Sequence, residues 1–389
     1  MVKKNKAKAS SKASISSPTA QSKSGTCCTT STDLFKHLPA FYSVTSSSLK
    51  QTFDLNTIHP AIQKVGLKTS NKLLNRGRSR SIAMLEAFQQ LISDHKVDPQ
   101  QTLMSSLLKS ITLSERFLDK CRPLAPAQLS ILQYLKLYMS SLPQDEESSR
   151  AKLIEYCTHF IDTRIHVASD LIGEHIRSKL TQDDVILTYG ASTTVLSALI
   201  SASRMTKFKV IVVDSRPDEE GFRAVERLTK EGIETTFCLL TGLSFVISKV
   251  TKVILGVSAM LSNGSAFGLC GTATVALTAH ASNIPVVVVC ETYRFIEHCQ
   301  LDSVTWNELG DPHDLVVADV PRPLSSTRPS EVTEGNIGGF ATNDNLDILN
   351  LVYDVTPIHY IDVIVSEWGY IPPTAVPLVL REFKESAIF

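Results

Sequence analysis

The sequence predicts an α/β protein in which an all-helical N-terminal half precedes a half built on a mostly parallel sheet. Two observations support this prediction. Up to about residue 180 the apolar residues recur every three or four positions, as they do on one face of a helix. Beyond that point short β-branched runs alternate with helix-like stretches, which is the order of elements in a doubly wound sheet.

Length and composition agree with two folded parts. The chain has 389 residues, whereas a single core rarely grows past about 250 residues. Hydrophobic residues make up 43% and charged residues 20%, which excludes a wholly disordered chain and a small disulfide scaffold. We find neither an apolar run long enough for a membrane span nor a secretion signal. The eight cysteines form no C-x-x-C pair, so we expect a reducing, cytoplasmic compartment and no membrane contact.

Residues 1–32 predict a disordered, basic tail rich in serine and threonine. Six lysines lie there without any acidic residue, and few large apolar side chains could offset the entropy of ordering. The rest of the chain carries all 39 acidic residues and is slightly acidic. It therefore lacks the clustered basic face of a nucleic-acid-binding protein, and we expect no specific nucleic-acid partner. Because the overall charge is close to zero, self-repulsion is weak and permanent protein partners are expected.

The helical half spans residues 33–180. Helical apolar spacing is clear at 82–92 and at 129–139, and no strand pattern interrupts this half. A longer helical segment, 145–180, is expected to link the two halves.

The second half spans residues 181–389. Short β-branched runs predict buried parallel strands at 185–187, 210–213, 253–255, 285–289 and 361–365. Helices are predicted between them at 195–203, 221–231 and 272–282. Residues 319–345, rich in proline and glycine, predict an irregular insertion before the last strands.

The first strand of this half leads into Tyr189-Gly190-Ala191-Ser192, and a later strand ends at Asp214. This spacing imitates a dinucleotide-binding turn, but only one of the three usual glycines is present, which favours an ordinary turn. Ser192 also lacks the glycine frame of a nucleophile elbow. We therefore expect no cofactor here.

Arg216 follows the strand that ends at Asp214, at the sheet edge where α/β proteins collect ligands. Its guanidinium could bind a phosphate or a partner's carboxylate. Local pairing with Asp218, Glu219 or Glu220 is the favoured alternative.

Three further patterns are interpreted as structural features without a chemical role. Asn263-Gly264 predicts a type I′ turn, and Gly271-Thr272 predicts a helix start with the threonine as its cap. Cys290, His298 and Cys299 lack a fourth ligand and the paired spacing of a zinc site, so no metal is expected.

Several longer segments together resemble a known family. The chain is similar, from about Asn71 to Leu380, to the subunits of eukaryotic translation initiation factor 2B, and most of all to the delta subunits. The segments that carry the resemblance are Asn75 to Arg80, Cys121 to Leu124, Val212 to Pro217 with Gly221 and Arg223, Leu261 to Ser265, Cys290 to Phe295, and Asn350 to Pro357.

That family is related to sugar-phosphate aldose–ketose isomerases, which place a helical domain before a Rossmann-like domain. The resemblance therefore implies a Rossmann-like fold for residues 181–389. The isomerases keep a catalytic cysteine where this chain has Gly190, and a catalytic aspartate where it has Ser258. Their substrate-binding Asn-Lys pair aligns with Gly268 and Leu269.

The resemblance thus implies a chain that is not an enzyme and has no catalytic, cofactor or metal residues. Moving a proton between adjacent carbons requires a titratable group near neutrality, and a glycine offers none. Arg80 falls where the family keeps an arginine near the substrate. A remnant anion pocket, or an interface, is predicted at Arg80, Gly190, Arg216, Arg223, Ser258 and Gly268. The alternative function is a sugar-phosphate isomerase.

By resemblance, the function is that of a non-catalytic, regulatory subunit of the cytosolic guanine-nucleotide exchange complex that acts on translation initiation factor 2. The family implies a decamer with two copies each of alpha, beta, gamma, delta and epsilon subunits. Alpha, beta and delta subunits would form its core, with gamma and epsilon outside. The helical domains would sense the phosphorylated alpha subunit of the substrate factor, as part of the integrated stress response.

Overall fold

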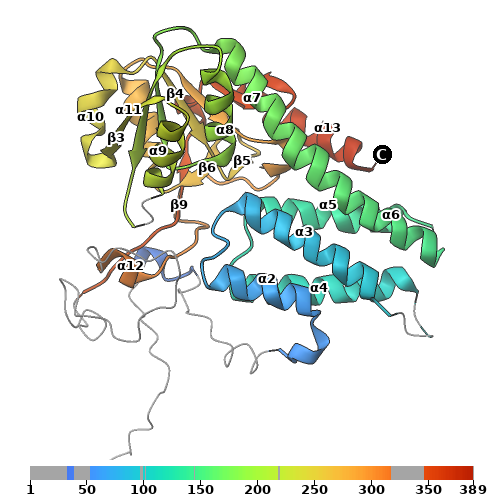
Figure 1. The fold of residues 1–389 in the computed structure, drawn as a ribbon. Coiled ribbons are helices and arrows are strands. Elements are labelled where there is room, and N and C mark those ends of the chain that lie inside the picture. The colour runs from blue at the N-terminus through green and yellow to red at the C-terminus, as the bar shows by residue number, and fades with distance from the viewer. Residues whose placement is uncertain are drawn as a thin grey trace, which may run out of the picture.

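The computed structural model describes residues 33–38, 53–96, 100, 102–143, 145–217, 220–316 and 346–388. The predicted tail, 1–32, and the predicted insertion, 319–345, lie outside these ranges. Five helices form the lower part of the molecule as drawn in Figure 1. They are α2 (Pro60–Ser70), α3 (Gly77–Asp94), α4 (Leu103–Cys121), α5 (Pro126–Ser141) and α6 (Glu146–His159).

The core of this helical half follows from the apolar spacing of its helices. Each helix turns its repeating apolar face inward, so that Phe88 of α3, Leu107 and Phe117 of α4 and Leu135 of α5 are essentially inaccessible to solvent. The predicted helices at 82–92 and 129–139 are confirmed as parts of α3 and α5.

A single helical rod connects the two halves (Figure 1). It consists of α6, a π-helical segment (Phe160–Val167) and α7 (Ala168–Lys179). The first part of the rod packs on α3, and α7 packs on α8 (Thr193–Ser203) of the second half. The predicted linking helix is confirmed, but the π-helical segment inside it is not visible in the apolar spacing.

A seven-stranded sheet forms the centre of the second half, in the order β11-β10-β7-β4-β1-β2-β3. All neighbouring strands are parallel except β10 and β11. In this register Ile186 pairs with Val210, and Val253 pairs with Val286. The strands are β1 (Val185–Tyr189), β2 (Lys209–Asp214), β3 (Glu234–Leu239), β4 (Lys252–Gly256), β7 (Val286–Val289), β10 (Val363–Ser366) and β11 (Gly369–Ile371).

Helices cover both faces of this sheet, as the alternating pattern predicts. One buried cluster joins α7, α8 and α9 (Gly221–Lys230) to one face, with Ile176, Val195 and Leu228 among its members. A second cluster joins α10 (Leu243–Val246) and α11 (Thr272–Ala281) to the other face. All five predicted strands and all three predicted helices of this half are present.

A second sheet, in the order β8-β5-β6-β9, was not predicted. Its strands are β5 (Ala259–Leu261), β6 (Ala266–Leu269), β8 (Phe295–Ile296) and β9 (Tyr353–Thr356). They have two to four residues each, too few for a period of two to stand out. The turn between β5 and β6 also differs from the predicted type I′. Gly264 has a positive φ of 80° but Asn263 does not, and a type I′ turn requires both.

The two halves share apolar contacts. The side chain of Tyr293, from the loop after β7, is fully buried inside the core of the helical half. The last helix, α13 (Val376–Ile388), packs against α5. Among the described residues, no helix is both long and apolar enough to cross a membrane.

Candidate functional site

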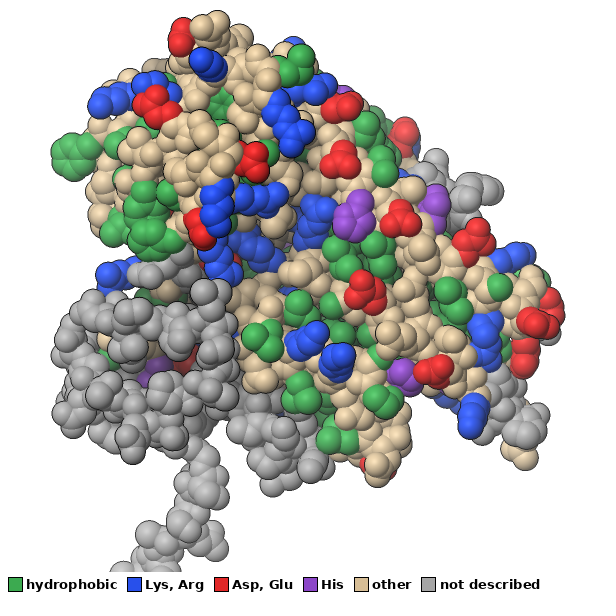
Figure 2. Space-filling view, viewed as in Figure 1, with side chains coloured by type: hydrophobic (Ala, Val, Ile, Leu, Met, Phe, Trp, Pro, Cys, Tyr) green, Lys and Arg blue, Asp and Glu red, His purple; other side chains and the backbone are tan. Residues whose placement is uncertain are grey.

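A cavity of about 1270 Å³ lies between the two halves. Its walls come from the carboxyl ends of β1, β2 and β4 and from loops of the helical half. Lysine and arginine side chains gather where the halves meet (Figure 2). The basic residues that line the cavity are Lys72, Arg76, Arg78, Arg116, Lys120, Arg122, Arg216 and Arg294. The acidic residues that line it are Asp119, Asp214, Glu220, Glu308, Asp311 and Asp314.

Three of the six predicted site residues line this cavity, namely Gly190, Arg216 and Ser258. Gly190 directly follows β1 and has a positive φ of 64°. A Cβ at this position would meet only the Leu269 side chain, at 3.7 Å. A cysteine there would have room but would be held in a backbone conformation that side chains disfavour. Ser258 follows β4, and its amide donates to the carbonyl of Phe267, 2.8 Å away.

Arg223 and Gly268 are not among the residues that line the cavity. Arg223 is exposed on α9. Gly268 is buried, and a Cβ built on it would lie 2.8 Å from the hydroxyl oxygen of Thr272 and 3.0 Å from its Cβ. The Thr272 side chain therefore leaves no room for the first atom of an asparagine side chain at this position.

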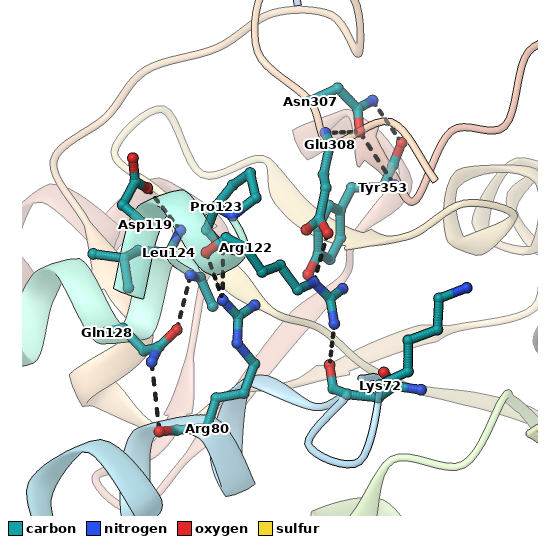
Figure 3. Close-up of polar contacts among 12 residues, drawn as sticks. Lys72, Arg80, Asp119, Arg122, Pro123, Leu124, Gln128, Asn307, Glu308 and Tyr353 are labelled. Atoms are coloured by element: carbon teal, nitrogen blue, oxygen red, sulfur yellow. Dashed lines mark hydrogen bonds and ion pairs between the residues drawn. The ribbon is translucent and has the colours of Figure 1, made fainter. Parts of the chain in front are cut away.

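Arg80 is also outside the cavity lining, and it is 1% exposed. Its Nη2 donates to the carbonyl oxygens of Pro123, at 2.6 Å, and of Arg122, at 3.4 Å (Figure 3). Nε and Nη1 of Arg80 have no hydrogen-bond partner among the described residues. Burial, together with the nearby Arg122, lowers the pKa of Arg80 to about 10. The guanidinium thus holds the loop that follows α4 instead of reaching into the cavity.

Three basic residues of the cavity, from the helical half, are paired with carboxylates of the second half. Arg122 Nε lies 2.6 Å from Glu308 Oε1, and this pair is visible in Figure 3. Lys72 pairs with Asp314, and Arg76 pairs with Glu220. Glu220 was one of the three expected partners of Arg216, and the other two, residues 218 and 219, lie outside the described ranges. None of these pairs is predictable from local spacing, because the partners are far apart in the chain.

A buried charge network lies behind the cavity wall. Arg294 lines the cavity, and its Nε lies 3.1 Å from the buried Glu291 carboxylate. Burial disfavours the charged guanidinium, but Glu291, Tyr293 and Cys290 together outweigh burial and raise the pKa of Arg294. Glu291 also accepts a hydrogen bond from the Thr194 hydroxyl, at 2.7 Å. This network ties the strand ends to α8.

The start of α11 differs from the prediction. The helix begins at Thr272 after Gly271, whose φ is 109°, and the Thr272 hydroxyl donates back to the carbonyl of Leu269. The cap is Asp354 of β9, whose Oδ2 accepts from the amides of Gly271, at 2.7 Å, and Ala273, at 2.9 Å. Sequence reasoning missed Asp354, although it lies in a segment that carries the family resemblance.

Within the described ranges, no three histidine, cysteine, aspartate or glutamate side chains gather in a way that could hold a metal ion. Cys290 is buried, whereas Cys299 is exposed.

Comparisons with known proteins place the chain in context. A model of the initiation factor 2 subunit family matches residues 75–373. The chain is 36% identical over 364 residues to translation initiation factor eIF2B subunit delta of Dictyostelium discoideum. That match covers 92% of this chain and 57% of the relative, so this chain spans little more than half of its length. The chain is also 30% identical over 281 residues to ribose 1,5-bisphosphate isomerase of Pyrococcus furiosus, covering 71% of this chain and 81% of that enzyme.

Among solved structures, the fold is similar to a chain in the crystal structure of the tetrameric eIF2B-beta2-delta2 complex from C. thermophilum. The TM-score is 0.74 at 25% identity, over 88% of this chain and 99% of that chain. The resemblance indicated by the sequence motifs and the predicted fold class are both confirmed.

Proposed function

The chain belongs to the initiation factor 2 subunit family, and from this premise we propose that it is a non-catalytic, regulatory subunit of the guanine-nucleotide exchange complex that acts on translation initiation factor 2. The similarity to an eIF2B delta subunit over 92% of the chain supports this proposal. So does the similarity in fold to a chain of a beta2-delta2 complex.

The observation that carries the proposal is the set of side chains in and beside the cavity. An aldose–ketose isomerase needs an acid or base beside the reacting carbons and free cations for the phosphates. Here Gly190 offers no titratable group, and four of the eight basic residues already face carboxylates of the same chain. The Thr272 side chain leaves no room for a substrate-binding side chain at position 268.

The remaining parts of the proposal concern assembly and regulation. The chain would assemble in the cytosol with alpha, beta, gamma and epsilon subunits into a decamer with two copies of each. Residues 33–180 would form the helical domain that senses the phosphorylated alpha subunit of the substrate factor, and residues 181–389 the domain that pairs with neighbouring subunits. Such sensing needs only that the phosphorylated factor prefers one arrangement of the complex.

The proposal also covers the predicted site residues. Gly190, Arg216 and Ser258 would be the remnant of a reaction cleft. Arg80 would serve structure through its bonds to Arg122 and Pro123. Arg223, which is exposed, is available for an interface.

A second candidate is a ribose 1,5-bisphosphate isomerase, favoured by the 30% identity to the Pyrococcus furiosus enzyme. The two functions make opposite predictions for one purified sample. We expect the tagged full-length chain to co-purify with four other subunits, and the resulting complex to accelerate GDP release from initiation factor 2. The same sample should not interconvert ribose 1,5-bisphosphate and its ketose isomer. Isomerase turnover by a chain that recovers no partners would overturn the proposal.

A further inference from the structure

The two halves are joined by apolar contacts on one side of the cavity. The Tyr293 ring is inserted in the helical core, with its centroid 5.9 Å from that of Phe160 in an edge-on contact. Helix α5 also packs against β8 and α13. Contacts of this kind do not weaken when salt screens charges, because they depend on the removal of apolar surface from water.

The connecting rod changes its geometry beside this apolar contact. Residues Phe160–Val167 are π-helical, between a part that packs on α3 and a part that packs on α8. A π-helical turn interrupts the regular ladder of hydrogen bonds and is a common site of bending in a helix. The irregular segment therefore lies where the rod passes from one half to the other.

Ion pairs join the halves around the cavity itself. Lys72, Arg76 and Arg122 come from loops of the helical half, and their partners are Asp314, Glu220 and Glu308. All six side chains line the cavity, and they are between 12% and 33% exposed. Salt screens partly exposed pairs of this kind, although less strongly than it screens fully exposed pairs.

The acidic partners are themselves held to the second half. Glu308 lies beside Asn307, whose amide group donates to the carbonyl of Tyr353 at 2.8 Å. Near Asp314, the side chain of Asn350 donates to the carbonyl of Asp311 at 2.8 Å. Because neutral hydrogen bonds fasten Asn307 to β9 and Asp311 to Asn350, Glu308 and Asp314 would stay with the second half when their ion pairs are released.

We propose that these three ion pairs form a latch that keeps the cleft of this chain closed with its own carboxylates, and that the halves rotate about the π-helical segment and Tyr293 when the latch is released. The carboxylates thereby occupy three of the eight basic side chains that line the cavity, which an anionic ligand could otherwise use. This inference concerns the isolated fold and does not rest on the proposed function.

The test measures the distance between the halves in the full-length chain. Spin labels are placed at Lys64 of α2 and at Arg223 of α9, both exposed, through a ketone-bearing amino acid so that the native cysteines stay unchanged. Double electron–electron resonance then gives the distance distribution at low and high sodium chloride. We expect one main distance at low salt and a second, longer distance that grows as salt rises.

A latch variant and a control variant distinguish the effect of the latch ion pairs from the general effect of removing negative charge. Glu220→Gln with Glu308→Gln should enlarge the long-distance population at low salt roughly fivefold for each pair, the effect of about 1 kcal/mol. The control variant is Glu226→Gln with Glu234→Gln. It removes two exposed ion pairs of the second half, Glu226 with Lys230 and Glu234 with Lys209, and its distance distribution should resemble that of the wild type.

A charge swap provides an independent readout if the latch variant does not fold. Arg76→Glu with Glu220→Arg restores one pair in reverse and should return the distribution toward that of the wild type, whereas Arg76→Glu alone should not. The wild-type salt titration needs no variant. A wild-type distribution that does not change with salt, or equal effects of the latch and control variants, would overturn the proposal.

Discussion

At the scale of single residues, the two oxygens of the Asp354 carboxyl group lie in different environments, which shift its pKa in opposite directions. Its Oδ2 accepts two amide hydrogen bonds at the start of α11, where the helix dipole favours a negative charge. Its Oδ1 is buried without a hydrogen-bond partner among the described residues. Burial outweighs the two hydrogen bonds and raises the pKa of Asp354 to about 7.

This raised pKa predicts a pH-dependent stability. Since the pKa in the folded protein exceeds the value of about 3.9 in an unfolded chain, the folded state binds this proton more tightly. The stabilisation is complete below about pH 4 and is lost as the pH rises through about 7. Between pH 5 and pH 8 the free energy of unfolding should fall by roughly 2 kcal/mol more in the wild type than in Asp354→Asn. Urea denaturation at both pH values measures this difference, and parallel pH profiles would contradict it.

Arg76, Arg78 and Arg80 show that a positive charge alone does not identify a ligand-binding residue. Arg78 and Arg80 lie two positions apart on α3 and so point to opposite sides of the helix, whereas Arg76 precedes the helix and has an extended backbone. Arg76 pairs with Glu220, Arg78 donates to the Ser169 hydroxyl at 3.0 Å, and Arg80 is buried against carbonyl groups. The family resemblance predicted Arg80 for a remnant anion pocket or an interface, and Arg80 is buried outside the cavity lining.

At the scale of elements, the wall of the cavity depends on the close approach of β4 to the start of α8. Gly256 ends β4, and a Cβ built on it would lie 2.1 Å from Ser192 Oγ and 2.3 Å from Ser192 Cβ. Rotation about χ1 could move Ser192 Oγ away, but Ser192 Cβ is attached directly to the backbone and could not move far. The contact therefore requires a glycine, although an isolated glycine in a strand pattern says nothing about the helix that approaches it.

We expect Gly256→Ala to destabilise the protein by about 2 kcal/mol, as overpacking of a close contact does. Ser192→Gly should restore most of this loss in the double variant, because the next neighbour, Val195 Cγ2, is 3.3 Å away. Gly77→Ala is the matched control, since its added Cβ would meet only the Ala125 side chain, at 3.8 Å. Thermal or urea unfolding of the wild type, the single variants Gly256→Ala, Ser192→Gly and Gly77→Ala and the double variant measures these losses, and additive losses in the double variant would argue against a direct clash.

At the scale of the whole molecule, Tyr293 couples the two halves. The residue belongs to the loop after β7, yet its ring is part of the helical core. Its hydroxyl accepts a hydrogen bond from Arg294 Nε at 3.1 Å. Loss of the ring would leave a cavity in the helical core and remove a contact that both halves share.

We expect the wild type to unfold in one transition and Tyr293→Ala to unfold in two. Both tryptophans, Trp306 and Trp368, lie in the second half, so their fluorescence reports on that half while far-ultraviolet circular dichroism reports mainly on helices. The two probes should coincide in the wild type and in Tyr293→Phe, which keeps the ring. They should separate in Tyr293→Ala, and coincident transitions in that variant would show that Tyr293 does not couple the halves.

The sequence by itself determined the order of the two halves, five of the seven strands of the main sheet and three of the helices around it. It could do so because burial of one face of a helix or strand makes apolar residues recur at a regular spacing, and this spacing can be seen within a short stretch of sequence. The tertiary structure alone decided which side chains share the cavity, which carboxylates face its cations, and that Asp354 caps α11 from 81 to 83 residues away. These contacts join residues that are distant in the chain, and no local pattern records which distant residue each one meets.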